Sequence, residues 1–206
     1  MKKIVLPLAV TAGLVLFNYV ATNWAVQSAP AVTLDDSYKN RLASHVNSLK
    51  KTIAGKWEYN NAVAFFVDMK IASGKNRFFV YDLKADKIID QGLVAHGSGS
   101  ETGVGGQLRF SNVNKSLCTS LGKYQIGKSY EGQFGKAYKL YGLDQTNSNA
   151  FDRNIVLHKY HKVPYDEQTG AICNSYGCPM VNEDYFKRIE KIIDDSPKSI
   201  LLDIYY

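Results

Sequence analysis

Hydrophobic residues recur at helical spacing near the start of the chain. Between residues 34 and 53 the apolar positions lie three or four residues apart, and they are Leu34, Tyr38, Leu42, Val46, Leu49 and Ile53. This spacing places them on one face of a helix. Asp35 and Asp36 stand at its start and Gly55 follows its end, as the helix dipole and a left-handed cap favour. We predict a helix over 34–53 that packs on the rest of the protein, with an interaction arm as the alternative.

From residue 62 the pattern changes to short apolar runs separated by turn-forming residues. The runs are rich in β-branched and aromatic side chains, which favour strands. The predicted strands are 62–69, 77–83, 87–95, 122–126, 137–141, 154–159 and 199–206. After a loop and residues 175–181, a second helix should begin at the N-cap Asn182 and bury Tyr185, Ile189, Ile192 and Ile193. Many strands with few helices predict a mainly β (α+β) fold, a β-sandwich-like domain with peripheral helices.

The first 31 residues have the pattern of a secretory signal. Lys2 and Lys3 precede an apolar run from Ile4 to Val20, and small and polar residues follow as far as Ala31. Because the apolar stretch approaches the length of a membrane-spanning helix, an uncleaved anchor over residues 4–24 is the alternative. In both cases the rest of the protein is exported, to the periplasm or cell envelope. We therefore divide the chain into a signal (1–31), a helical segment (32–60) and a catalytic domain (61–206).

Composition and charge exclude several function classes. The chain has 206 residues, of which 45% are apolar, enough for one folded domain with a proper core. Its formal charge is +6, with scattered lysines and no arginine-rich stripe, so we expect no nucleic-acid partner. The glycines of residues 97–106 lack the G-K-[ST] ending of a phosphate-binding loop, and they predict a mobile flap instead.

The three cysteines are Cys118, Cys173 and Cys178. An exported protein can form disulfides, but an odd number leaves at least one free thiol that needs a reason. One hypothesis is a disulfide between Cys118 and Cys173, with Cys178 free. The cysteines form no CxxC pair, so we expect no structural zinc site, and no sequence feature calls for a metal or an organic cofactor.

The segment Ser175-Tyr176-Gly177-Cys178-Pro179 is a candidate nucleophile loop. A cysteine attacks as its thiolate and needs a base, while a preceding glycine lets backbone N–H groups approach a developing oxyanion. The candidate base is His158, at the end of a predicted strand. We expect a thiolate–imidazolium pair that lowers the pKa of Cys178. His161, on the following loop, is the competing base.

Residues Asp152–His158 and Ser175–Pro179 together resemble the signature of the L,D-transpeptidase (YkuD-type) catalytic domain, and more closely its murein L,D-transpeptidase branch. Further segments match in order, so that the resemblance covers about residues 62–206. These segments are Arg77–Leu83, Val94–Gly97, Phe110–Asn112 and Ser120–Gly122. The chain departs from the wider family at Tyr176, where His is common, and at Lys159, where Gly is usual.

The resemblance implies a cysteine acyl-transferase that acts on peptidoglycan stem peptides. Cys178 would attack the carbonyl between the third and fourth residues of a tetrapeptide stem and expel D-Ala. The thioester would pass to the side-chain amine of a second stem, giving a 3→3 crosslink. The resemblance further implies that His158 is the base, that the Lys159 carbonyl orients it, that the N–H groups of Gly177 and Cys178 form the oxyanion hole, and that carbapenems add to the thiol.

Three further residues have open roles. His96 lines the cleft or is a hydrogen-bonded turn residue, and Ser175 bonds within the site or shapes the turn. Arg153 binds a stem carboxylate or forms a structural ion pair with Asp152 or another acid. The reaction is open as well, because water as acceptor would make the protein an L,D-carboxypeptidase or an amidase, and a third alternative is a non-catalytic wall-binding protein.

Overall fold

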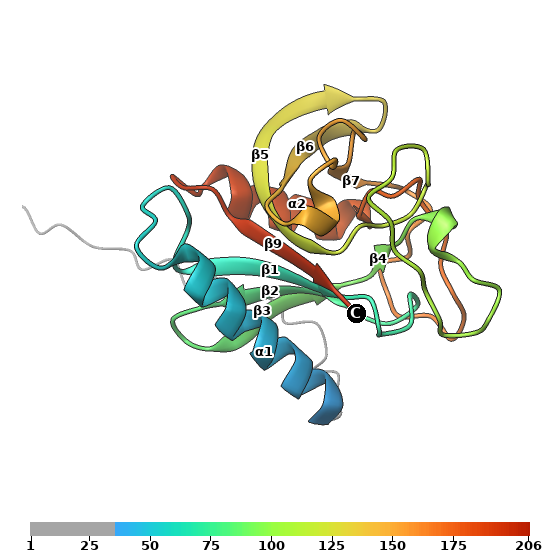
Figure 1. The fold of residues 1–206 in the computed structure, drawn as a ribbon, viewed down its shortest axis with the longest axis horizontal. Coiled ribbons are helices and arrows are strands. Elements are labelled where there is room, and N and C mark those ends of the chain that lie inside the picture. The colour runs from blue at the N-terminus through green and yellow to red at the C-terminus, as the bar shows by residue number, and fades with distance from the viewer. Residues whose placement is uncertain (1–35) are drawn as a thin grey trace, which may run out of the picture.

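The computed structural model describes residues 36–206, which contain two α-helices, nine strands and two short 3₁₀ helices (Figure 1). The predicted signal or anchor lies outside the described residues, as do Leu34 and Asp35. The helices are α1 (Asp36–Ile53) and α2 (Glu183–Asp194), and the 3₁₀ helices are η1 (Ser98–Ser100) and η2 (Gln145–Asn147). The strands are β1 (Val63–Asp68), β2 (Phe78–Asp82), β3 (Lys87–Gly92), β4 (Val94–Ala95), β5 (Gly122–Gly132), β6 (Gly135–Gly142), β7 (Val156–Lys159), β8 (Met180–Val181) and β9 (Leu201–Tyr205).

All nine strands hydrogen-bond into one sheet, in the order β3-β2-β1-β9-β5-β6-β7-β8-β4. Neighbours are antiparallel except for the pairs β1–β9 and β7–β8. The long strand β5 bends, and its pairing with β6 shifts register between Ile126 and Ser129, as at a bulge (Figure 1). The prediction of a mainly β fold with two helices is confirmed, and the sandwich-like layering comes from a single sheet that curves around its core.

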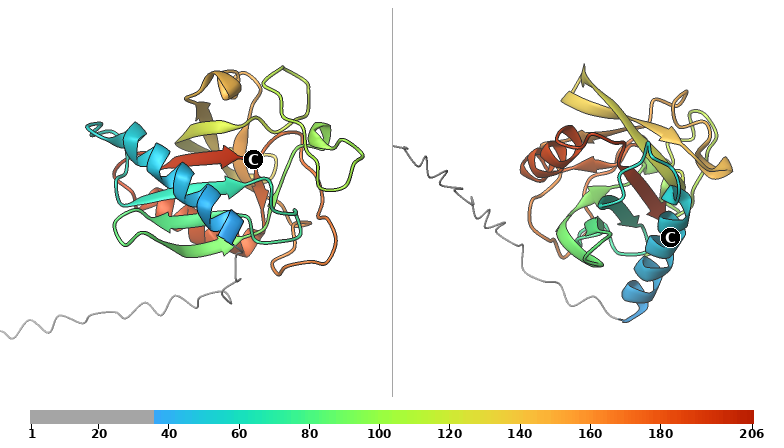
Figure 2. Two further views of the ribbon diagram at one scale, coloured as in Figure 1. Left: turned by 60° about the horizontal axis from the view of Figure 1, so that its bottom comes forward. Right: turned by 90° about the vertical axis from the view of Figure 1, so that its left-hand side faces the viewer.

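The two faces of the sheet bury different side chains because residues alternate along each strand. In β1, Phe65 and Val67 belong to a core that also contains Tyr185 and Ile189 of α2. The alternate residue Phe66 faces a second core, shared with α1. Figure 2 shows the two helices on opposite faces of this part of the sheet.

Helix α1 packs on the sheet with its apolar stripe, as predicted. Its most buried residues are Leu42, Val46, Leu49 and Ile53. Two polar contacts fix the helix further, because Arg41 pairs with the buried Asp68 at 2.9 Å and His45 Nδ1 lies 2.8 Å from a carboxylate oxygen of the buried Asp203. The helix therefore shares a hydrophobic core with β1, β2 and β9.

Helix α2 begins where the sequence predicted. The Asn182 side chain accepts a hydrogen bond from the amide of Asp184 at 2.8 Å and so caps the helix. Tyr185 and Ile189 are buried as expected, and so is Phe186, whereas Ile192 and Ile193 are only partly buried. Neither helix within residues 36–206 is long and apolar enough to cross a membrane.

The segment 87–95 forms two strands where the sequence predicted one. The chain leaves β3 after Gly92 and re-enters the sheet as β4 at the opposite edge, where β4 pairs with β8. The sequence gives no sign of this change of edge, because only the single residue Leu93 separates the two strands. The crossing brings residues 96–98, which follow β4, next to Ser175.

We predict that Leu49→Ala lowers the free energy of unfolding by about 2–5 kcal/mol, because Leu49 is fully buried between α1 and the sheet. Urea or thermal unfolding followed by circular dichroism measures the change. Asn47→Ala, at an exposed position of the same helix, is the control and should change stability little. Equal stability of the Leu49→Ala and Asn47→Ala proteins would show that α1 is not docked on the sheet.

Candidate active site

The parallel pair β7–β8 brings the predicted nucleophile and base together. His158 on β7 pairs with Met180 on β8, two residues after Cys178. Two residues before His158, the backbone N–H of Val156 donates to the Cys178 sulfur at 3.4 Å. Cys178 and His158 thus lie on adjacent segments of chain, close to each other in the register of the pair.

Gly177 allows the turn before the nucleophile. Its φ of +118° is in a region that other residues rarely adopt. A Cβ at this position would lie 2.9 Å from the Cys118 carbonyl oxygen and 3.1 Å from the Ile155 side chain. The position therefore requires glycine for its conformation and for the space around it.

The two N–H groups of the predicted oxyanion hole differ in their hydrogen bonding. The Gly177 N–H donates to the Ser175 hydroxyl oxygen at 3.0 Å, so Gly177 is not a free donor in this state. Ser175 therefore both bonds within the loop and shapes its turn. Within residues 36–206 the Cys178 N–H has no hydrogen-bond partner, which makes it the candidate donor that is free in this structure.

The Cys178 thiol is held by the chain that leads into β7. Its S–H group points to the Asn154 carbonyl oxygen at 3.6 Å, a weak contact. Asn154 itself has a φ of 55°, a left-handed conformation that asparagine adopts more readily than most residues. Although both side chains are described, no hydrogen bond joins the Cys178 sulfur to the His158 ring.

His158 is oriented by a backbone carbonyl, as the resemblance implied. Its Nδ1 lies 3.0 Å from the Lys159 carbonyl oxygen. Because a carbonyl only accepts, the proton of the neutral ring is on Nδ1 and Nε2 keeps its lone pair. Phe134, at the tip of the β5–β6 hairpin, stacks on the ring with centroids 5.2 Å apart. His158 is only 5% exposed, whereas Phe134 is 44% exposed and so covers the ring.

Burial gives the site a neutral resting state, contrary to the predicted thiolate–imidazolium pair. Burial raises the pKa of the Cys178 thiol above its ordinary value, although the Val156 N–H bond and the charge of Arg153 act in the opposite direction. Burial also lowers the pKa of His158, against the effect of its bond to Lys159. Desolvation disfavours the charged form of both groups, and no hydrogen bond between them compensates for it.

Arg153 bonds a neighbouring loop in this structure, and its binding of a stem carboxylate stays a prediction. Its guanidinium donates to the carbonyl oxygens of Ser111 and Cys118, at 2.8 and 2.6 Å, and to the hydroxyl group of Ser120. In the part of the chain that the structure describes it forms no ion pair with Asp152. Arg153 instead holds the loop 111–120 against Gly177 and supplies positive charge near the thiol.

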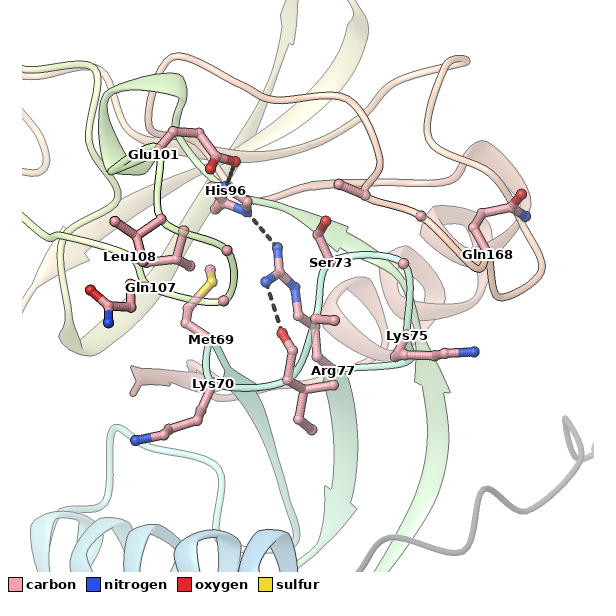
Figure 3. A pocket seen from close by; sticks show the side chains of 18 of the residues that line it. Met69, Lys70, Ser73, Lys75, Arg77, His96, Glu101, Gln107, Leu108 and Gln168 are labelled. Carbon is pink, nitrogen blue, oxygen red and sulfur yellow. Dashed lines mark hydrogen bonds and ion pairs between the residues drawn. The ribbon is translucent and has the colours of Figure 1, made fainter.

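The remaining predicted residues lie in different surroundings. Tyr176 is 79% exposed, and His161 is exposed, with its ring against Tyr160. His96 is buried and lines a cavity of about 440 Å³, with Arg77 on one side and Glu101 on the other (Figure 3). His96 is therefore held by hydrogen bonds, as one of its two predicted roles required, and the cavity that it lines does not include Cys178 or His158.

The hypothesis of a Cys118–Cys173 disulfide is wrong in this structure, where all three cysteines are free thiols. The Cys118 S–H group donates to the Gly99 carbonyl oxygen at 3.0 Å. Cys173 instead packs against a small core of Leu93, Ala95, Val163, Ile172 and Met180. The two sulfurs thus have separate surroundings. No group of three or more His, Cys, Asp or Glu side chains within residues 36–206 is arranged to hold a metal ion.

The sequence did not predict that Phe134 covers the His158 ring or that the Asn154 carbonyl contacts the Cys178 thiol. Phe134 lies 24 positions before His158, and only the pairing of β6 with β7 brings the hairpin tip over the ring. The one local signal was an aromatic residue between Gly132 and Gly135, in a turn where polar residues are usual.

A family model described as L,D-transpeptidase catalytic domain matches residues 35–202 of the chain. No curated protein matches the chain in sequence.

Several solved structures are similar in fold. The helical cell shape determining protein Pgp2 from Campylobacter jejuni gives a TM-score of 0.47 at 12% identity, over 77% of this chain and 53% of that one. An L,D-transpeptidase from Xylanimonas cellulosilytica gives 0.39 at 13% identity, over 71% and 61%. The Ldtfm–avibactam carbamoyl enzyme gives 0.44 at 10% identity, over 71% and 50%. The chain spans only 50–61% of the length of these structures.

We predict that Phe134→Ala raises the pKa of His158 toward its ordinary value, because the substitution lets water reach the buried ring. On acidification, His158 of the variant would therefore become protonated at a higher pH than His158 of the wild-type protein. Histidine NMR titration measures this pKa directly. The control is Phe151→Ala, since Phe151 stacks on Tyr141 of the same hairpin and not on His158. An equal His158 pKa in the Phe134→Ala and wild-type proteins would contradict the covering role.

Proposed function

The chain belongs to the family of L,D-transpeptidase catalytic domains, and on that premise we propose that it is an exported enzyme that crosslinks peptidoglycan stems through a Cys178 thioester. The family places it among acyl-transferases. Export rests on the signal-like pattern of residues 1–31. The single observation that carries the proposal is the Val156 contact to the Cys178 sulfur, because it places the thiol beside the strand that bears His158.

In the first step, a stem peptide binds with the carbonyl between its third and fourth residues next to Cys178. The thiol proton passes to Nε2 of His158 as the sulfur attacks, so that charge develops only in the transition state. The Lys159 carbonyl stabilises the imidazolium that forms, through the bond at 3.0 Å. The Cys178 N–H is the free donor to the oxyanion, with the Gly177 N–H as a second donor once it is released from Ser175.

The attack gives a tetrahedral intermediate, and its collapse breaks the carbon–nitrogen bond to the fourth residue. The proton held by His158 goes to the leaving amine, so that D-Ala departs and a thioester remains on Cys178. In the second step the side-chain amine of another stem loses a proton to His158 and attacks the thioester. The carbon–sulfur bond then breaks, His158 returns the proton to the sulfur of Cys178, and a 3→3 crosslink is left between the two stems. Water in place of the amine would give carboxypeptidase action with the same groups.

Mass spectrometry of the products from a purified disaccharide-tetrapeptide tests this proposal. The expected product is a dimer that has lost one D-Ala. Loss of D-Ala without a dimer would assign the chain as an L,D-carboxypeptidase. An unchanged substrate would contradict an enzymatic role on these stems and favour a wall-binding protein.

We predict that Cys178→Ala abolishes this conversion and that His158→Ala lowers its rate by about 10²–10⁴-fold, the usual contribution of a positioned base. Both variants should keep the wild-type circular dichroism spectrum. Cys173→Ala is the matched control, since it removes a thiol that takes no part in the proposed chemistry, and it should keep its activity. Conversion at the wild-type rate by Cys178→Ala would refute the nucleophile assignment.

A further inference from the structure

A chain of three side chains lies beside the nucleophile loop. His96, which is 3% exposed, has its Nδ1 2.9 Å from Arg77 Nη2 and its Nε2 2.7 Å from Glu101 Oε1 (Figure 3). A guanidinium only donates, so Nδ1 accepts and the proton of the neutral ring is on Nε2. The ring therefore donates that proton to the Glu101 carboxylate. Both ring nitrogens are engaged, and the tautomer is fixed.

Arg77, at one end of this hydrogen-bonded series, is held in place by backbone carbonyl groups. Its Nε and Nη2 donate to the Val94 carbonyl oxygen at 2.9 and 2.7 Å, and its Nη1 donates to the Ile71 carbonyl oxygen at 3.1 Å. Burial lowers the pKa of Arg77 to about 9, which leaves it cationic at neutral pH. Burial and the charge of Arg77 also lower the pKa of His96, so that the neutral ring is favoured. A second proton on His96 Nδ1 would point at an N–H group of Arg77, and two donors cannot form a hydrogen bond with each other.

The other side of His96 is bonded to the nucleophile loop. The His96 carbonyl accepts from the Ser175 N–H at 2.8 Å, and the Ser98 N–H donates to the Ser175 carbonyl at 2.7 Å. The Ser175 hydroxyl in turn accepts from the Gly177 N–H, next to Cys178. Glu101 adds a direct link, since Asn174 Nδ2 lies 3.5 Å from its carboxylate. Residues 96–101 are thus joined to residues 174–177 at several points.

We propose that Arg77, His96 and Glu101 are positioning residues for Cys178. By locking the His96 ring from both sides they hold residues 96–98 in place, and these residues hold the loop 174–178 in its reactive geometry. This inference rests on the proposed function for its effect on catalysis. Its structural half, the fixing of the loop, holds without any substrate.

Glu101 is the residue to vary, because it is half-exposed and its loss should not prevent folding, whereas Arg77 and His96 are buried. Glu101→Ala removes the acceptor of the Nε2 proton. Glu101→Gln keeps it, because the amide oxygen accepts as the carboxylate does. The matched control is Glu167→Ala, a carboxylate that bonds the Lys75 side chain and the Asn76 amide near the same cavity.

The first readout is hydrogen exchange of the Ser175 and Gly177 amides, which needs no substrate. We expect exchange to be at least roughly tenfold faster in Glu101→Ala and unchanged in Glu101→Gln and Glu167→Ala, since only the first variant frees the loop to open. Unchanged exchange in Glu101→Ala would overturn the proposal. If Glu101→Ala shows the faster exchange but the wild-type protein converts no stem peptide, the proposed function is refuted and the positioning role stays in place.

The second readout is the rate of D-Ala release from a disaccharide-tetrapeptide. We expect Glu101→Ala to lower kcat by about 10–100-fold, the effect of a small misplacement of the reacting groups, with KM changed by less than about threefold. Glu101→Gln should stay within about threefold of wild type. An equal loss in Glu101→Ala and Glu101→Gln with a raised KM would show that Glu101 binds the substrate directly and would overturn the positioning role, as would full activity of Glu101→Ala.

Discussion

The parallel pairing of β7 with β8 is the constraint on which the candidate site depends. Parallel strands need a crossover, and here the 20 residues between Lys159 and Met180 form it and carry the nucleophile loop back to the sheet. The pairing sets His158 against Met180 and the Val156 amide against the Cys178 sulfur. Gly177 completes the approach, since any side chain there would meet the Cys118 carbonyl.

Burial sets the resting protonation states of Cys178 and His158. A buried thiol and a buried imidazole both favour their neutral forms, so the site rests uncharged. In the proposed mechanism, the fixed groups around the site face charge that appears only during reaction, namely the Lys159 carbonyl for the imidazolium and the Cys178 N–H for the oxyanion. Such groups need no reorganisation when the charge forms, which is the kind of stabilisation that lowers a barrier most. The neutral resting thiol is also less reactive toward chance oxidants, because the thiolate is the form that they attack.

The sequence predicted local features well and long-range ones only in part. The apolar run of β1 and the cap at Asn182 are encoded within a few residues, and both elements appear where they were expected. The split of 87–95 into two strands at opposite sheet edges is a property of the whole sheet. The same holds for Arg153, whose acceptors lie 33–42 positions away, and for Phe134, which reaches His158 through a hairpin. Cys178 and His158 were found because the motif around each is short and the order of the two is characteristic.

The most direct test of this account is to trap the acyl-enzyme. The wild-type protein is mixed with a disaccharide-tetrapeptide, quenched in acid within the first turnover, and analysed by intact-mass and peptide-mapping mass spectrometry. The account predicts a mass increase equal to the disaccharide-tripeptide acyl group, attached to the peptide that contains Cys178. Release of D-Ala with no adduct on that peptide, or an adduct on Cys118 or Cys173, would contradict it.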